Sequence, residues 1–225
     1  MPGDTLAVLV EEKGPFTIRQ SVDNTLDVVE GLIAAHRMGV IHRDVKPSNC
    51  FLDADQTVKI GDFGLSKSLG SGDANLTQTG TFMGTPSYSA PEQVRGEPVD
   101  ARTDIYAIGA TLYCLLTGQS PFVGDAMSVT AQIVSDTPVP SRQVRPEIPY
   151  DLDETVMRCL EKDPAKRFET LEQLRTALLP FASYGTSLAN FGRRLAAFMT
   201  DYLLVNLILF LLFVSLGAYL VSEQE

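Results

Sequence analysis

The sequence predicts an α+β fold that is mainly α-helical. Apolar residues recur at the spacing of an amphipathic helix in several long stretches, whereas the pattern of strand, turn and strand is confined to residues 50–60. The 225 residues are enough for one large domain or two small ones. Residues 202–221 contain no charged side chain, and this run predicts a transmembrane helix after the folded part.

Charge and cysteine content narrow the range of partners. The chain has 18 Lys and Arg against 28 Asp and Glu, a net charge of -10, and no basic cluster, so we expect no nucleic-acid partner. The 3 cysteines are isolated and lack the spacing of a zinc site or a disulfide framework. Residues Met1–Val10 lack the basic start and apolar core of a secretory signal. We therefore expect the folded part to stay in the cytoplasm.

The first long helix is expected over residues 18–38. Thr17 and Gln20 form a capping-box pattern, in which each side chain satisfies a free backbone N–H group of the first turn. Gly39 suits the C-terminal end of this helix. The apolar positions with helical spacing are Val22, Leu26, Val29 and Ile33.

A hairpin is expected to follow this helix. Residues 50–60 have the pattern of a strand, a polar turn and a second strand, which brings Asp62 back beside Asp44. Residues 70–81 are rich in Gly, Ser and Thr and show no periodicity. We expect them to form a mobile loop.

The second half of the chain is expected to be helical. Asp100 can cap a helix that ends at Gly118, and its apolar residues cover most of its surface, which predicts the buried central helix. Thr170 and Gln173 form a second capping-box pattern. The proline-rich residues 137–149 predict a linker. Further helices are expected near residues 126–134, 152–160 and 171–179.

The end of the chain predicts a membrane anchor. Residues 182–201 form an amphipathic linker that becomes basic at Arg193 and Arg194, directly before the uncharged residues 202–221. About 20 apolar residues span the hydrocarbon core of a bilayer. Because the arginines precede the span, the positive-inside tendency puts the folded part on the cytoplasmic side. A long buried core helix is the alternative interpretation of the run.

One short stretch carries the chemistry of a phosphoryl-transfer site. Residues His42–Asn49 have the sequence HRDVKPSN. Asp44 can accept the proton of an attacking hydroxyl or orient that hydroxyl, and Lys46 can lie against the transferred phosphoryl group. Asn49 and Asp62 offer the oxygen ligands that Mg²⁺ prefers.

These motifs resemble the C-terminal lobe of eukaryotic-type Ser/Thr protein kinases. Residues His42–Asn49 resemble the family's catalytic loop, Asp62–Gly64 its metal-binding DFG motif, and Ala90–Glu92 the end of its activation segment. The resemblance covers roughly Pro2–Phe181, so residues 1–181 are expected to form a kinase-like C-lobe. It implies ATP and Mg²⁺ as cofactors, held by Lys46, Asn49 and Asp62, and a protein substrate.

The type of hydroxyl that is phosphorylated follows from the same resemblance. Lys46–Ser48 and the stretch Gly84–Pro86 are similar to Ser/Thr kinases rather than Tyr kinases. Thr85 in that stretch joins Asp44 and Lys46 as an expected catalytic residue. The resemblance therefore implies transfer of the γ-phosphoryl group of ATP to Ser or Thr of a protein.

The resemblance also assigns structural and regulatory roles. Asp104 is expected to brace the backbone of the catalytic loop, and Arg167 to pair with Glu92. His42 and Phe63 match an internal stack of side chains, and Gly64 completes the metal-binding motif. Arg43 is typical of kinases regulated by phosphorylation of the activation loop. The candidate phosphorylation sites are Thr77, Thr79 and Thr81, with simple solvation of a loop as the alternative.

Several kinase features do not occur in the sequence. The 225 residues contain no glycine-rich loop, no nucleotide-binding lysine and no partner glutamate, and Lys13 is expected to be a surface turn residue. We therefore expect a kinase whose N-terminal lobe is a missing partner, with weak ATP binding by this chain alone. One alternative is a non-catalytic docking module. Another is the regulatory part of a multi-span membrane protein. Residues 191–201 resemble the start of an RDD-type membrane domain, with Arg194 and Asp201 at the matching positions, and a single membrane anchor is the alternative.

Overall fold

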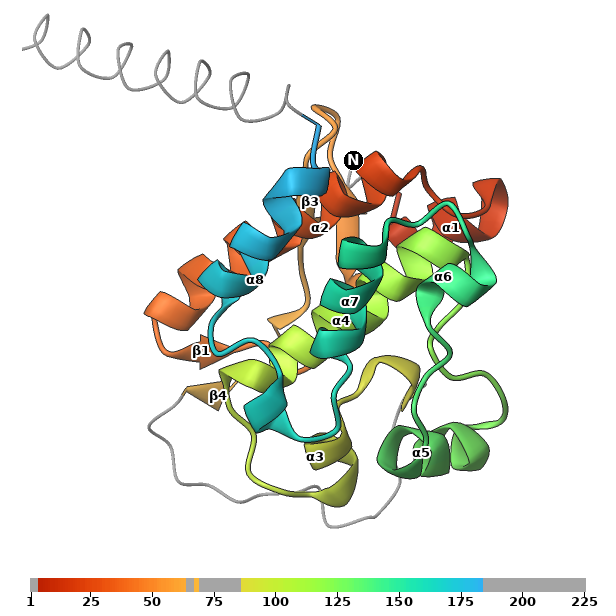
Figure 1. Ribbon diagram of the computed structural model, residues 1–225. Coiled ribbons are helices and arrows are strands. Elements are labelled where there is room, and N and C mark those ends of the chain that lie inside the picture. The colour runs from red at the N-terminus through yellow and green to blue at the C-terminus, as the bar shows by residue number, and fades with distance from the viewer. Residues whose placement is uncertain (1–3, 64–66, 69–85, 184–225) are drawn as a thin grey trace, which may run out of the picture. The chain divides into compact units, whose positions relative to one another are not determined.

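A buried central helix organises the fold. The computed structural model describes residues 4–63, 67–68 and 86–183, and within them helix α4 (Ala101–Thr117) runs through the middle of the kinase-like part (Figure 1). The side chain of Asp100 accepts a hydrogen bond from the backbone of Arg102, and Gly118 ends the helix in the left-handed conformation at φ 81°. Every residue from 103 to 116 is buried. The predicted core helix is confirmed.

Helix α2 (Ile18–Arg37) packs along α4 and also contacts α8 (Leu171–Leu178). Both capping groups predicted for α2 are present, because Gln20 N donates to the Thr17 side chain while Gln20 Oε1 accepts from Thr17 N. The apolar face of α2 is buried, with Val22, Val29 and Leu32 each fully inaccessible. This face fixes the position of the chain that leads into His42.

Helix α1 (Leu6–Lys13) corrects one expectation from the sequence. Lys13 is exposed, but it is the last residue of a helix that Gly14 ends at φ 78°, not part of a surface turn. The helical pattern of this segment is weak because the helix has only 8 residues. It is stabilised mainly by burial of Leu6, Leu9 and Val10 in the core.

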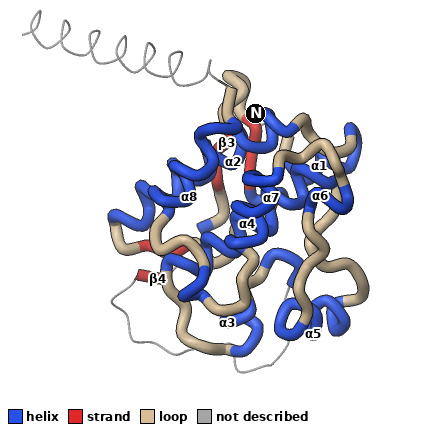
Figure 2. The backbone as a smooth tube through the Cα atoms, in the orientation of Figure 1, coloured by secondary structure: helices blue, strands red, loops and turns tan. Residues whose placement is uncertain are grey.

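The strands form two short antiparallel pairs (Figure 2). Strands β2 (Cys50–Leu52) and β3 (Val58–Ile60) make the predicted hairpin. Strand β1 (Val40–Ile41) pairs with β4 (Lys67–Ser68). Because Gly61 N donates to Asn49 O over 2.9 Å, the residue before Asp62 is tied to the end of the catalytic loop.

The remaining helices surround α4 and largely follow the sequence prediction. The predicted linker at residues 137–149 contains a short helix, α6 (Ser141–Val144). Ser141 Oγ and Arg142 N both donate to the buried Asp153, so a distant carboxylate holds this turn. The predicted helices near residues 126–134, 152–160 and 171–179 agree with the observed ones to within two residues. The helices around α4 that have not yet been given bounds are α3 (Pro91–Arg95), α5 (Ala126–Ser135) and α7 (Tyr150–Cys159).

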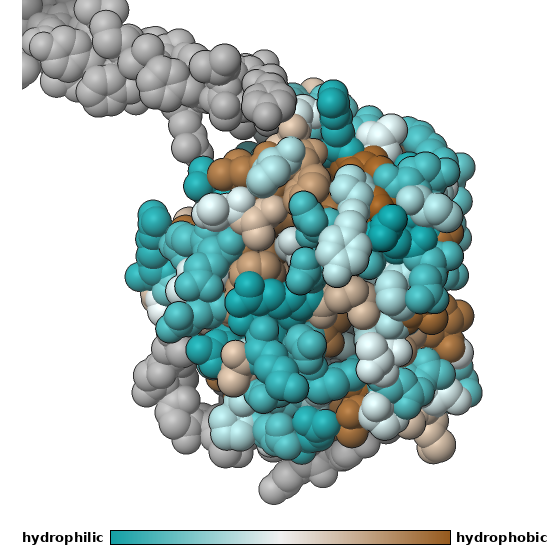
Figure 3. Space-filling view, in the orientation of Figure 1, coloured by the Kyte–Doolittle hydropathy of each residue, from teal (hydrophilic) through white to brown (hydrophobic). Residues whose placement is uncertain are grey.

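The surface in view is mostly polar, with small apolar groups between the polar residues (Figure 3). Within the described ranges, no helix combines the length and apolar character needed to cross a membrane. The predicted transmembrane helix at residues 202–221 and nearly all of the predicted linker 182–201 lie outside the described residues. The apolar residues of the described part are instead gathered in one main core around α4.

Candidate active site

The backbone at the start of the catalytic loop is fixed by one buried carboxylate. Asp104, in the first turn of α4, is fully buried and accepts hydrogen bonds from His42 N at 2.9 Å and from Arg43 N at 2.8 Å. Arg43 has φ 70°, in the left-handed region that costs a non-glycine residue conformational energy. The interactions around Arg43 therefore hold a strained turn directly before Asp44.

The two carboxylate oxygens of Asp44 differ in their hydrogen bonds. Oδ2 accepts from Lys46 Nζ at 2.8 Å and from Asn49 Nδ2 at 2.9 Å. Asn49 Nδ2 also donates to the Asp44 backbone carbonyl, so the Asn49 amide nitrogen is fully used inside the loop. Since these bonds converge on Oδ2, Oδ1 has no hydrogen-bond partner among the described residues and is able to accept a hydrogen bond from a hydroxyl group.

His42 connects the catalytic loop to the segment that carries Asp62. Its Nδ1 accepts from Asp44 N at 3.3 Å, so Nε2 carries the proton and donates to the Gly61 carbonyl at 2.9 Å. The ring of His42 also lies 4.5 Å from the ring of Phe63, measured between centroids. Asp62 follows Gly61 directly and is exposed at φ 57°. These contacts hold Asp62 next to the loop.

The oxygen groups at this site fit a magnesium ion. The amide oxygen of Asn49 is left available by its nitrogen, and Asp62 contributes an exposed carboxylate. Mg²⁺ in phosphoryl-transfer sites is held by one or two side-chain oxygens together with water and phosphate oxygens. Among the described residues there is no cluster of three or more His, Cys, Asp or Glu side chains suited to a metal ion. Asn49 and Asp62 are therefore the residues that would hold a magnesium ion at this site.

A buried ion pair anchors α3 beside the site. Arg167 donates to both carboxylate oxygens of Glu92, over 2.8 Å each, and Thr103 Oγ1 donates to Glu92 at 2.9 Å. Burial acts to raise the pKa of Glu92, but the hydrogen bonds and charge of Arg167 outweigh burial and lower that pKa from 4.5. Arg167 also donates to the carbonyls of Arg102 and Glu161. The pair joins segments separated by 75 positions in the sequence.

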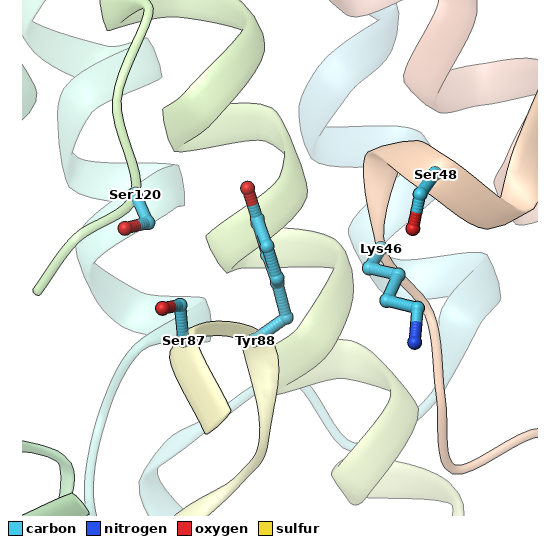
Figure 4. A pocket seen from close by; sticks show the side chains of 5 residues that line it. All are labelled: Lys46, Ser48, Ser87, Tyr88 and Ser120. Carbon is cyan, nitrogen blue, oxygen red and sulfur yellow. The ribbon is translucent and has the colours of Figure 1, made fainter. Parts of the chain in front are cut away.

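A small cavity of about 290 Å³ opens beside the catalytic loop (Figure 4). Lys46 and Ser48 line it from the catalytic loop, Ser87 and Tyr88 from the segment just before Ala90, and Ser120 from the loop after α4. The side chains that line this space therefore carry hydroxyl groups and one ammonium group. This chemistry suits a polar peptide segment.

Several predicted site residues lie outside the described part of the chain. They are the third residue of the metal-binding motif, the predicted catalytic threonine and the candidate phosphorylation sites, namely Gly64, Thr85, Thr77, Thr79 and Thr81. The remaining predicted residues fall into two groups. The catalytic-loop residues lie around Asp44, with Asp104 beneath them, and Glu92 and Arg167 form the neighbouring ion pair.

Two residues at the site were not found from the sequence. His36 Nε2 lies 2.7 Å from Asp104 Oδ2, and Gln93 Nε2 donates to the carbonyl of Arg43 at 2.8 Å. The partners are 68 and 50 positions apart in the sequence. No local spacing signals such contacts, because they depend on how α2, α3 and α4 pack.

Comparison with known proteins agrees with this geometry. Residues 1–179 match the protein kinase domain, and the chain belongs to the protein kinase domain family. Among its relatives, the serine/threonine-protein kinase PknB of Mycobacterium leprae is 40% identical over 178 residues, which cover 79% of this chain and 28% of that protein. PknB of Mycobacterium tuberculosis strain H37Rv is 39% identical over the same shares. The probable serine/threonine-protein kinase SCO3848 of Streptomyces coelicolor is 37% identical over 174 residues, 77% of this chain and 26% of that protein. The chain thus spans about a quarter of the length of these relatives.

Proposed function

We propose that the chain belongs to a serine/threonine protein kinase that transfers the γ-phosphoryl group of ATP to a Ser or Thr hydroxyl of a protein substrate. The observation that carries this proposal is the different hydrogen bonding of the two carboxylate oxygens of Asp44. Lys46 and Asn49 hold Oδ2, while Oδ1 remains for the hydroxyl. A carboxylate oriented in this way positions a nucleophile and accepts its proton.

The surrounding residues supply the other requirements of phosphoryl transfer. Lys46 Nζ lies beside the catalytic carboxylate, where its charge stabilises the transferred phosphoryl group. Asn49 and Asp62 would hold magnesium, which neutralises the charge of the nucleotide phosphates. The polar cavity between Ser48, Ser87 and Ser120 would receive the peptide that carries the hydroxyl. Thr85 is proposed to complete the catalytic residues.

The proposed reaction also requires residues that cover the nucleotide. A glycine-rich loop and a strand lysine perform this task in protein kinases, and neither pattern occurs in the 225 residues. We therefore propose residues 1–181 as the large lobe of the kinase, which works together with an N-terminal lobe. This makes fusion to the N-lobe of a relative a direct test of the site.

The decisive experiment fuses the N-lobe of a relative, such as the PknB proteins above, to residues 1–225 and measures transfer of phosphate from ATP to a Ser- and Thr-containing protein. Asp44→Asn should lower kcat by about 10²–10⁴-fold, the usual range for loss of a catalytic acid or base. Asp27→Asn is the control, because the Asp27 carboxylate accepts a hydrogen bond from Val58 N and has no contact with the catalytic loop in the structure. Activity of Asp44→Asn within tenfold of the parent would contradict the proposal. A folded but inactive parent fusion would instead favour a docking module.

We further propose that phosphorylation of Thr77, Thr79 or Thr81 regulates the kinase. The Nε atom of Arg43 is buried and has no hydrogen-bond partner among the described residues. A phosphate group would supply both acceptor oxygens and negative charge to this guanidinium. In the active fusion, mass spectrometry should find phosphate on at least one threonine, and the triple alanine variant should lose activity. Full activity of that variant would exclude this regulation.

A membrane-anchored kinase with a cytoplasmic catalytic part is the third proposal. It is supported by the uncharged residues 202–221 and by Arg193 and Arg194 before them. Expressed in bacteria, the full chain should remain in the membrane fraction after washing with alkaline carbonate. The double variant Phe210→Arg/Leu212→Arg should release it, because charged residues in the centre of a span are costly. Release of the unchanged chain by carbonate would contradict anchoring.

A further inference from the structure

A glutamine near the start of a helix recurs three times in the described part of the chain. Gln20 Oε1 accepts from Thr17 N at 3.3 Å, Gln93 Oε1 from Ala90 N at 3.0 Å, and Gln173 Oε1 from Glu169 N at 3.1 Å. All three side chains therefore use the amide oxygen to satisfy a free N–H group at a helix start. Gln93 differs from the other two in what its nitrogen does.

The amide nitrogen of Gln93 donates to the carbonyl of Arg43 at 2.8 Å. Arg43 is the residue held in the left-handed region at φ 70°, directly before Asp44. Its N–H group is bound on the other side by Asp104 Oδ1, also at 2.8 Å. Asp104 thus fixes the peptide group before Arg43 and Gln93 fixes the peptide group after it. The second peptide group is the one that carries the nitrogen of Asp44.

Helix α3 is a firm support for this contact. The residue before Gln93 is Glu92, which is 3% exposed and bound by Arg167 and Thr103. Because Glu92 fixes the position of α3, the side chain of Gln93 has little freedom to follow movements of the loop. It can instead oppose rotation of the peptide group between Arg43 and Asp44, a rotation that would turn Oδ1 of Asp44 away from the substrate.

We infer that Gln93 is a positioning residue for the catalytic acid, linking the end of the activation segment to the catalytic loop through the carbonyl of Arg43. The inference rests on the proposed kinase function. It assigns to Gln93 a task distinct from that of Glu92. Glu92 holds α3 to the segment around Arg167, whereas Gln93 holds the catalytic loop to α3.

The test uses Gln93→Glu. Glutamate keeps the side-chain length and the oxygen that caps Ala90 N, but it removes the donor and places negative charge against the Arg43 carbonyl. Gln20→Glu and Gln173→Glu are matched controls, because both keep their caps and neither side chain contacts the catalytic loop in the structure. Amide hydrogen exchange of residues 42–46 is measured in the chain of residues 1–225. Exchange there should rise at least tenfold in Gln93→Glu and stay within twofold of the parent in both controls, while α4 amides remain protected in all three.

The second readout is kinetic and uses the fusion with an N-lobe. Gln93→Glu should lower kcat at least tenfold and leave KM for ATP within twofold, because it turns the acid without altering the nucleotide contacts. Unchanged hydrogen exchange at residues 42–46 would overturn the inference. An equal rise of the exchange rate throughout α4 would also overturn it, because that result indicates a general loss of stability. An inactive parent fusion would contradict the proposed function and leave the exchange result to decide the role of Gln93. If Gln93→Glu fails to fold, Gln93→Met compared with Gln173→Met provides the same two measurements.

Discussion

At the scale of single residues, the catalytic loop depends on buried polar groups whose hydrogen bonds are almost all satisfied. Asp104 and Asn49 are buried, and each makes two or more hydrogen bonds within or to the loop. A buried polar group without a partner costs free energy, so full pairing keeps this loop in one conformation. The exceptions among the described side chains are Arg43 Nε and Thr111 Oγ1. The first lies beside the catalytic residue and the second lies inside α4.

Thr111→Val is expected to stabilise the protein. Thr111 is 2% exposed, and its hydroxyl has no hydrogen-bond partner among the described residues, so replacement of the hydroxyl by a methyl group removes an unpaired polar atom from the core. The free energy of unfolding should rise by about 1 kcal/mol. Denaturant unfolding measures this change.

Thr103→Val is the matched control for this prediction. Thr103 is also fully buried in α4, but its hydroxyl donates to Glu92 Oε1 at 2.9 Å. The same substitution should therefore lower the free energy of unfolding by about 1–3 kcal/mol. Stabilisation by both substitutions, or by neither, would show that pairing of the hydroxyl does not decide the outcome.

At the scale of elements, long-range contacts between short segments hold the site together. Helix α3 has only 5 residues, and its position depends on the ion pair between Glu92 and Arg167 rather than on its own stability. Close approach also matters for the longer helices. A Cβ atom added at Gly109 would lie 2.4 Å from Cys159 Cβ, so α4 and α7 pack with no room for a side chain between them. These contacts set the positions of α3 and α7 on the central helix.

The ion pair predicts a dependence of stability on acid pH. The pKa of Glu92 is lower in the folded protein than its ordinary value of 4.5, so the unfolded state takes up the proton first as pH falls. The stabilisation is fully present above pH 4.5 and is lost as pH falls through the lower pKa of the folded state. Glu92→Gln should cost about 3–5 kcal/mol at pH 7, because it leaves the buried charge of Arg167 unpaired. The difference from the parent should shrink below pH 4.5.

Glu30→Gln is the control for the ion pair. Glu30 and Arg175 also form an ion pair, but both side chains are about half exposed, at 52% and 42%. Exposed pairs contribute up to about 1 kcal/mol, so this substitution should change stability little at any pH. Urea unfolding between pH 3 and pH 7 separates the two cases. A difference between parent and Glu92→Gln that is constant over this range would contradict the assigned pKa direction.

At the scale of the whole molecule, the described part carries Asp44, Lys46 and the proposed magnesium ligands Asn49 and Asp62 on the catalytic loop and the segment next to it. It contains no group with the pattern expected to cover a nucleotide, because Lys13 ends α1 at the surface and precedes α2 by a short turn. The proposed groups for phosphoryl transfer thus lie in the described part without the residue patterns that would cover ATP.

The chain of residues 1–225 should bind ATP weakly. Without a glycine-rich loop and a strand lysine, the nucleotide would contact only Lys46, Asn49 and Asp62 through its phosphates and magnesium. Titration calorimetry with ATP and Mg²⁺ should give a Kd above about 1 mM, and phosphate transfer should be negligible. Fusion to an N-lobe should restore tighter binding. A robust rate from residues 1–225 alone, abolished by Asp44→Ala, would overturn this prediction.

Local patterns predicted the elements with strong signals. The capping residues Thr17, Asp100 and Thr170 and the terminating Gly118 mark helix ends that the structure shares, since a cap is satisfied by the backbone of its own helix. Helix α6 was missed because the carboxylate that holds it, Asp153, is supplied by α7. The 8 residues of α1 were missed because burial in the core, not propensity, stabilises them.

The sequence by itself determined the family and the proposed type of chemistry, because the candidate acid, lysine and magnesium ligands lie within His42–Asn49 and at Asp62. Only the tertiary structure decided the orientation of those side chains. The left-handed turn at Arg43 depends on Asp104 from α4 and on Gln93 from α3, and His36 at the end of α2 contacts the same aspartate. Such contacts join residues far apart in the chain, so they arise only when burial of the apolar faces has brought these helices together.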